Sequence, residues 1–179
     1  MKYIRAILLV WGALSGVVVL AVGSYLFYQY SYGNTSKSDQ AEVEDVRFVL
    51  NWANLGDDRI ESVEHSYKSS RSLTGDHLDA YAIQITKVEL SELKTKERGG
   101  QKWTQGDQAH GVLKESIELV SSFVNLNKLN WFPSEEKLLS NKVHITSWSI
   151  LLHDERVTSA KLTFVFPGEK MVYYASVEI

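Results

Sequence analysis

The chain has 179 residues, of which 44% are hydrophobic and 23% charged, with a formal net charge of -3 and no cysteine. The absence of cysteine excludes disulfides, thiolate nucleophiles and cysteine-bound zinc or iron–sulfur clusters, and the small acidic charge argues against a nucleic-acid partner. With only 2 prolines but 5 Trp, 9 Tyr and 6 Phe, the composition is that of a folded chain and excludes a low-complexity one.

A long run without any charge, residues 6–28, is the clearest feature near the N-terminus. As a helix this run would be about 35 Å long, which is enough to cross a hydrocarbon core of about 30 Å. Aromatic residues lie toward its ends, at Trp11 and from Tyr25 to Tyr30, where they suit the headgroup regions. The pattern predicts a single-pass transmembrane anchor over residues 6–30, preceded by a short segment over residues 1–5.

The flanks of the run predict its orientation. Lys2 and Arg5 precede it, whereas the charges that follow are mostly acidic. The positive-inside rule therefore places residues 1–5 in the cytoplasm and the C-terminal domain outside it, periplasmic or extracellular, on a bacterial inner membrane. The alternative is a cleaved signal sequence, because Ala21-Val22-Gly23 is a small-x-small triplet. The apolar run continues past this triplet, which favours a retained anchor.

Three glycines, Gly12, Gly16 and Gly23, fall on one face of the expected helix. The first two form a GxxxG pair, and small residues on one face let a second helix approach closely. The pattern permits a homodimer through the membrane helix. The alternative is that glycine is simply common in membrane helices.

Residues 31–41 are small and polar without periodicity, which predicts a flexible tether. The folded domain is expected over residues 42–179. Apolar residues recur at helical spacing over residues 43–53 and again from Leu113 to Val124, with Asp107 as the expected N-cap of the second helix.

Five runs have the alternation of strands: 59–68, 77–85, 142–153, 157–166 and 171–179. The third is apolar on both faces and is expected to be central, and the turn at 167–170 begins with Pro-Gly, which favours type II. The order α-β-β-α-β-β-β predicts an α+β, two-layer domain: an antiparallel sheet of about five strands with two helices on one face.

The best cluster for chemistry is formed by His65, His77 and Asp79. His77 and Asp79 share a strand face, and a hairpin centred near Ser72 would place His65 opposite Asp79. Imidazole and carboxylate groups so placed could bind a divalent metal or act as an acid/base pair. The alternative, which the sequence favours, is a cross-strand ion pair at the rim of the sheet. No motif for a cofactor is present.

Two further segments are candidates for contacts with partners. A basic loop carries Lys94, Lys96, Arg98 and Lys102, and such a loop could touch anionic lipid, nucleic acid or an acidic partner or could simply be solvated. Trp131 and Phe132 could form a docking surface, but folding back over the core is the favoured alternative.

Taken together, the anchor, the tether and the lack of a catalytic signature predict a non-enzymatic membrane protein. Its partners would be the lipid bilayer and another protein of the cell envelope, which the outer domain binds or helps to assemble. The layout is similar to that of inner-membrane components of bacterial secretion and pilus machines, a likeness that assigns no site residue. The alternatives are a membrane-tethered hydrolase or metal-dependent enzyme at His65, His77 and Asp79, and a ligand-binding sensor domain.

Overall fold

The computed structural model describes residues 2–28, 35–72, 75–94 and 102–179. The chain divides into two units, Met1–Thr35 and Ser36–Ile179. The first contains one helix, α1 (Lys2–Tyr28), which is long and apolar enough to cross a membrane: its segment Trp11–Tyr28 has a mean hydropathy of 1.6 and none of it is buried. Gly12, Gly16 and Gly23 are open to solvent or lipid, since a Cβ built on any of them meets nothing within 4 Å.

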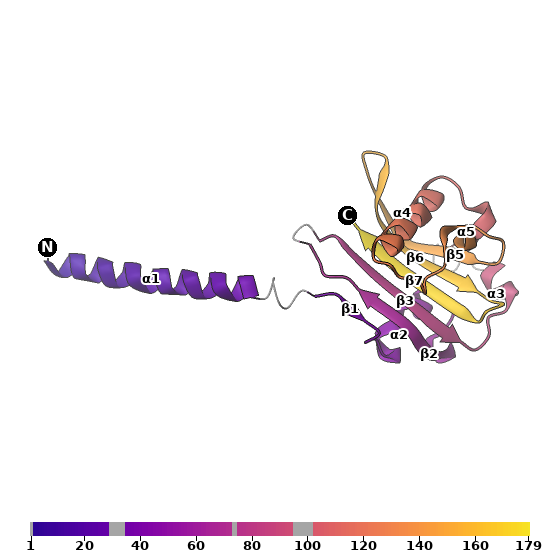
Figure 1. Ribbon diagram of the computed structural model, residues 1–179, viewed down its shortest axis with the longest axis horizontal. Helices are drawn as coiled ribbons and strands as arrows, with labels where there is room; N and C mark the ends of the chain where they lie inside the picture. The colour runs from indigo at the N-terminus through magenta and orange to yellow at the C-terminus, as the bar shows by residue number, and fades with distance from the viewer. Residues whose placement is uncertain (1, 29–34, 73–74, 95–101) are drawn as a thin grey trace. The chain divides into compact units, whose positions relative to one another are not determined.

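The second unit is built on a seven-stranded antiparallel sheet with the order β1-β2-β3-β7-β6-β5-β4 (Figure 1). The strands are β1 (Lys37–Ser38), β2 (Ile60–Lys68), β3 (His77–Ile85), β4 (Thr104–Gln105), β5 (His144–His153), β6 (Arg156–Phe166) and β7 (Met171–Glu178). The helices are α2 (Val43–Trp52), α3 (Leu90–Lys94), α4 (Val112–Leu126) and α5 (Glu135–Leu138), with 3-10 turns at Asp57–Arg59 and Gly106–Gln108.

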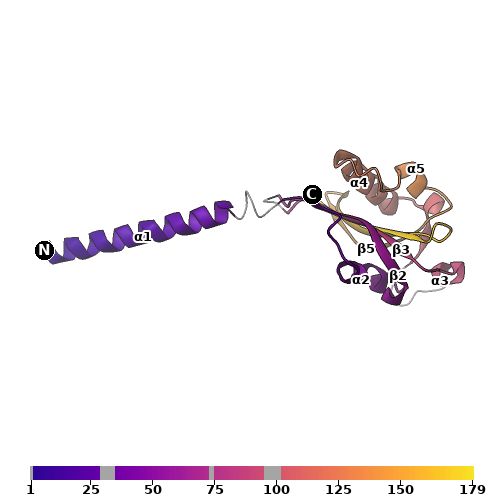
Figure 2. The ribbon, with the colours of Figure 1, turned by 60° about the horizontal axis from the view of Figure 1, so that its bottom comes forward.

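Helices cover both faces of the sheet, with α2 on one side and α4 and α5 on the other (Figure 2). Each side has its own apolar core. One cluster joins α4 and α5 to the sheet through residues such as Ile117 and Phe164, and the other joins α2 and α3 to it through Leu50 and Ile83. The expected two-layer arrangement with helices on one face is therefore wrong.

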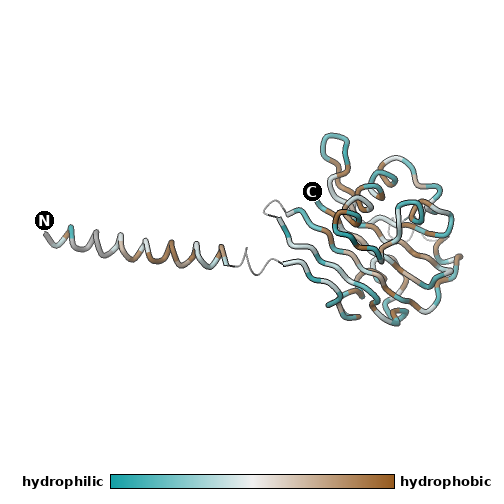
Figure 3. The backbone as a smooth tube through the Cα atoms, viewed as in Figure 1, coloured by the Kyte–Doolittle hydropathy of each residue, from teal (hydrophilic) through white to brown (hydrophobic). Residues whose placement is uncertain are grey.

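The two-sided core follows from strands that carry apolar residues at both odd and even positions. In β3, Leu78 and Ala80 face the core under α4, whereas Tyr81 and Ile83 face the core under α2. A strand with one solvated face would alternate between apolar and polar side chains instead. In the hydropathy view, apolar colour accordingly runs along the middle of the sheet, while the loops and turns around it are mostly hydrophilic (Figure 3).

The coarse prediction is confirmed: the domain mixes helices with an antiparallel sheet and is α+β. The strand count is not, because β1 and β4 add two very short edge strands. The long strand expected at the centre, β5, lies second from the edge. Asp107 does not cap α4, whose N-cap is Gly111 with a φ of 55°, and the β6–β7 turn has its positive φ at Lys170 rather than at Gly168, which excludes type II.

The edge strand β1 lies within the stretch that the sequence predicts to be a tether. Lys37 and Ser38 pair with Lys68 and Tyr67 of β2, and the Asp39 carboxylate accepts a hydrogen bond of 3.0 Å from the backbone N–H of Ser66. These contacts attach residues from Lys37 onward to the sheet, and residues 31–34 of the predicted tether lie outside the described residues.

Candidate functional site

The three residues of the predicted chemical cluster do not converge. In the β2–β3 hairpin His65 lies opposite Ala82, and it is Lys68 that faces Asp79. The expected register is therefore wrong, because the connection between the strands is centred further along the chain than Ser72. The His65 ring instead stacks on Trp131, with 5.3 Å between ring centroids, and its Nδ1 lies 3.4 Å from the Asp39 carboxylate.

His77 and Asp79 share a strand face, as predicted, but bind different partners. The His77 Nδ1 lies 2.8 Å from the Gly75 carbonyl, and its Nε2 lies 3.5 Å from the Ser176 hydroxyl. Arg71 donates a hydrogen bond of 3.1 Å to the Asp79 carboxylate. Within the described ranges no three His, Asp or Glu residues come together as metal ligands, so the hypothesis of a metal centre on these residues gains no support from the geometry.

In the Ser176–His77 contact a hydroxyl faces an imidazole whose other nitrogen faces an acceptor, which is the arrangement of nucleophile, base and orienting group in nucleophilic catalysis. A carbonyl only accepts, so the Nδ1 facing Gly75 carries the proton and Nε2 is left to accept from the Ser176 hydroxyl. Ser176 and His77 are buried, with 4% and 8% of their surface exposed, and a substrate carbonyl would have to reach a hydroxyl on β7, which lies between β3 and β6. The contact is best explained as a polar tie between β3 and β7.

The other two predicted segments have separate outcomes. In the basic loop, Lys96 and Arg98 lie outside the described residues, the side chain of Lys94 is not described, and Lys102 is exposed. Phe132 is buried, with edge-on contacts to Phe164 and Tyr173, so its folding back onto the core is confirmed. Trp131 is half-buried, stacked on His65.

A feature that the sequence analysis did not single out is the outer edge of β5. The neighbouring strand β4 covers only the first two residues of β5, through the pairs Gln105–His144 and Thr104–Ile145. From Ser147 to His153 the side of β5 that faces away from β6 pairs with no strand in the part of the chain that the structure describes. Its outward N–H and C=O groups form a row to which an extended chain could add.

The side chains along this open edge are uncharged from Ser147 to Leu152. Leu151 and Leu152 are 55% and 52% exposed, and they lie in the hairpin that projects at the top of Figure 1. Both β2, at the other side of the sheet, and β5 are interrupted by two register shifts, which in β5 lie at Ser147–Ser149 and Leu151–Leu152. The two strands differ in charge, since β2 carries Glu61 and Glu64. Charges and bulges of that kind protect an edge from pairing, and β5 lacks the charges.

Contacts within the domain hold β5 in place, and none of those described here covers its outer edge. Trp148 packs on Trp52 of α2, with ring centroids 4.7 Å apart, and Trp52 in turn packs edge-on against Phe48. On the inner strand of the hairpin, the Glu115 carboxylate of α4 accepts a hydrogen bond of 2.9 Å from the Val157 N–H. The hairpin is thus attached to helices on both faces of the sheet.

Phe48 belongs to an aromatic cluster with Tyr81 and Tyr174, whose rings stack 5.9 Å apart beneath α2. Burial raises the pKa of Tyr174 to about 12, with a smaller opposing effect from its hydrogen bond to Ser176. Burial, followed by the nearby Asp79 charge, also raises the pKa of Tyr81. Both phenols therefore remain neutral at physiological pH, and the cluster forms a rigid base for α2 and β5.

Comparison with protein-family models, with curated proteins and with solved structures gave no match. The candidate site is therefore argued from its geometry alone. One signal in the sequence could have identified it. Outside the anchor, the longest charge-free stretch that combines β-branched or aromatic residues with leucines is that of β5. The sequence before it also predicts no long strand that could pair with its outer side.

Proposed function

We propose that the protein is a membrane-anchored protein-interaction module that binds an extended segment of another cell-envelope protein along the outer edge of β5. The observation that carries the proposal is the edge from Ser147 to His153, which pairs with no strand among the described residues, is uncharged as far as Leu152 and has two exposed leucines. In the proposal α1 is a retained anchor with its N-terminus in the cytoplasm, and the domain lies on the periplasmic or extracellular side of an inner membrane.

The chemistry of the edge defines the kind of partner. Backbone hydrogen bonds along an added strand contribute affinity, and side-chain pairs across it contribute specificity. Since the edge offers serine, tryptophan, isoleucine and leucine, the complementary strand carries apolar or small side chains opposite Leu151 and Leu152. A charged residue there would lose hydration without gaining an ion pair.

The test places a photo-crosslinking amino acid at Leu151 or at Leu152 of the full chain in its native membrane. Leu126, at the end of α4 and 76% exposed, is the matched control position. We expect one adduct of defined mass from positions 151 and 152 and none from 126, and Ser149→Pro, which removes a strand N–H, to reduce its yield at least fivefold.

Three results would contradict the proposal: no adduct from the β5 positions, the same adduct from position 126, or an adduct whose mass is that of two copies of this chain. Mass spectrometry of the crosslinked peptide identifies the partner segment. An extended segment with apolar side chains at alternate positions is the expected result, and a helical or strongly charged segment would overturn it.

A further inference from the structure

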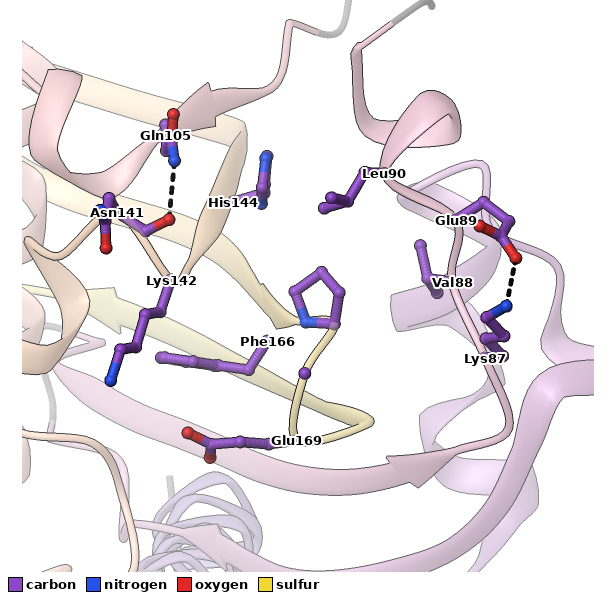
Figure 4. Close-up of a pocket in the computed structure, with 12 residues that line it drawn as sticks. Lys87, Val88, Glu89, Leu90, Gln105, Asn141, Lys142, His144, Phe166 and Glu169 are labelled. Atoms are coloured by element: carbon purple, nitrogen blue, oxygen red, sulfur yellow. Dashed lines mark hydrogen bonds and ion pairs between the residues drawn. The ribbon is translucent and has the colours of Figure 1, made fainter.

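A cavity of about 520 Å³ opens at the end of the sheet opposite the β5–β6 turn. Its walls come from four places in the sequence: the connection from Lys87 to Leu90 after β3, Gln105 in β4, the start of β5, and the β6–β7 turn (Figure 4). Ligand sites for small molecules span about 300–1,000 Å³, so the cavity has the size of such a site.

The apolar part of the lining consists of four side chains, Val88, Leu90, Phe166 and Pro167. Leu90 is 50% exposed and Pro167 is partly exposed, whereas Phe166 and Val88, at 1% and 4%, lie at the base with little accessible surface. Figure 4 shows Leu90 extending from the start of α3 toward the ring of His144. A leucine that leaves half of its surface open beside a cavity contributes apolar area for a ligand to cover.

The charges around the cavity do not balance. Glu89 pairs with Lys87 at 2.6 Å, and Glu169 pairs with Lys137 at 2.8 Å, so that both lining carboxylates already have a cation. Lys142 is exposed and forms no ion pair within the described residues. The Lys137 ammonium lies 4.9 Å from the centre of the Phe166 ring, but its charge is already matched by Glu169.

From this lining we propose that the cavity binds a small organic anion with an apolar body, an aromatic or aliphatic carboxylate. The apolar body lies between Phe166, Val88 and Leu90, and the carboxylate lies beside Lys142. In Figure 4 the Lys142 side chain extends past the end of the Phe166 ring, on the side away from Leu90 and Val88, so the ligand in this proposal spans the ring to reach the ammonium. Such pairing of an ammonium with a carboxylate gives a charge-assisted hydrogen bond.

The site is independent of the edge of β5. It is lined by residues before β5 reaches Ile145 and after β6 ends at Phe166, whereas the open edge begins at Ser147. Binding in the cavity therefore requires neither a protein partner nor the exposed leucines of the hairpin, and the two proposals stand or fall separately.

The test measures the binding of 1-naphthoate to the full chain in lipid nanodiscs by isothermal titration calorimetry, with empty nanodiscs as the blank. We expect 1-naphthoate to bind at least tenfold more tightly than 1-naphthamide or 1-naphthylmethylammonium, which have the same ring system without the negative charge. Octanoate, titrated in parallel, determines whether an aliphatic body is accepted as well as an aromatic one.

Two variants locate the binding. Lys142→Glu should weaken 1-naphthoate binding at least tenfold, and Leu90→Asp at least fivefold. The same changes at exposed positions of α4, Lys114→Glu and Leu126→Asp, should leave it unchanged. No heat above the blank for either acid, equal binding of the three naphthalene probes, or insensitivity to both cavity variants would overturn the proposal.

Discussion

Gly106 lies where the packing leaves no room for a side chain. It is buried, its N–H bonds to the Val143 carbonyl at 3.0 Å, and a Cβ at this position would stand 2.5 Å from the Ser140 carbonyl oxygen and 2.6 Å from a Val143 methyl. We predict that Gly106→Ala lowers the free energy of unfolding by about 1–3 kcal/mol, as other overpacked substitutions do. Urea unfolding measures the change.

Gly168 supplies the matched control, because a Cβ there meets nothing within 4 Å and its φ is not positive. Gly168→Ala should change the free energy of unfolding by no more than about 0.5 kcal/mol. Equal effects of the two substitutions would show that the close approach at Gly106 does not constrain the fold.

The raised phenol pKa values predict a loss of stability at alkaline pH. A tyrosine ionises at about pH 10 in the unfolded chain, whereas burial raises the pKa of Tyr174 to about 12 in the folded domain. Its contribution is fully present below pH 10 and is lost as the pH rises toward 12, by about 1.4 kcal/mol per pH unit. Urea midpoints at pH 9, 10 and 11 measure this slope.

Tyr174→Phe isolates this effect from the titration of lysines, which the variant retains. The variant should be less stable than the wild type at pH 9, since the hydrogen bond to Ser176 is lost, but its stability should fall less steeply between pH 10 and 11. Parallel slopes for wild type and variant would refute the assignment to Tyr174.

For single residues, the sequence predicted which side chains share a strand face better than it predicted which residues lie opposite each other on neighbouring strands. That His77 and Asp79 share a face follows from the period of a strand, and it is correct. That His65 would meet Asp79 depended on the register of the hairpin, which is determined by the conformation of the connecting turn. A displaced turn moves His65 opposite Ala82 and separates the predicted cluster into three unrelated contacts.

Among the structural elements, the β5–β6 turn contains a correctable strain. Asp154 and Glu155 both have positive φ, at 48° and 65°, as the two central residues of a type I′ turn require. Asn and Gly are the preferred residues at these positions, so Asp154→Asn with Glu155→Gly should raise the free energy of unfolding by about 0.5–1 kcal/mol. Chemical denaturation of the double variant measures the gain.

Glu169→Gly in the β6–β7 turn is the comparison. Glu169 does not have a positive φ, and its carboxylate pairs with Lys137 at 2.8 Å. Glycine there relieves no strain and removes the ion pair, so this variant should be no more stable than the wild type. A gain of similar size in both turns would show that the left-handed backbone at Asp154 and Glu155 is not the cause.

Elements with several periods of a pattern were predictable, and shorter ones were not. Helix α4 shows its stripe through Ile117, Val120 and Val124, all of which are buried. Strands β1 and β4 have two residues each, and two residues contain no period. In β3 the sequence does contain evidence for helices on both faces, because Leu78 and Ala80 point to one face and Tyr81 and Ile83 to the other. This pattern indicates two cores only when the strand is known to lie inside the sheet.

On the scale of the whole chain, the two proposed sites use opposite ends of the same pair of strands. The cavity lies where β6 ends and β5 begins, and the open edge runs toward their shared turn. The domain that carries both has its own cores, since neither cluster includes a described residue of the first unit. Both proposed interactions therefore use residues 36–179, and in the proposal α1 supplies the attachment.

Attachment through α1 is tested by placing charge in its middle. An arginine at the centre of a membrane helix costs about 2.5–3.5 kcal/mol for insertion, so Leu14→Arg with Val18→Arg removes most of the gain from the apolar segment. The wild type should remain in membranes after alkaline carbonate washing, and the double variant should move to the soluble fraction. Leu14→Ile with Val18→Leu, which preserves the apolar surface, should behave as the wild type does.

Protease digestion of intact spheroplasts tests the orientation. Protease added outside spheroplasts should digest the domain and leave the N-terminal residues intact, because the positive-inside rule predicts that Lys2 and Arg5 hold them in the cytoplasm. Substituting both with glutamate should reduce the fraction of chains that the protease reaches. A wild-type chain that stays soluble after fractionation, or a domain that resists protease until the spheroplasts are lysed, would contradict the anchored arrangement on which the partner at β5 depends.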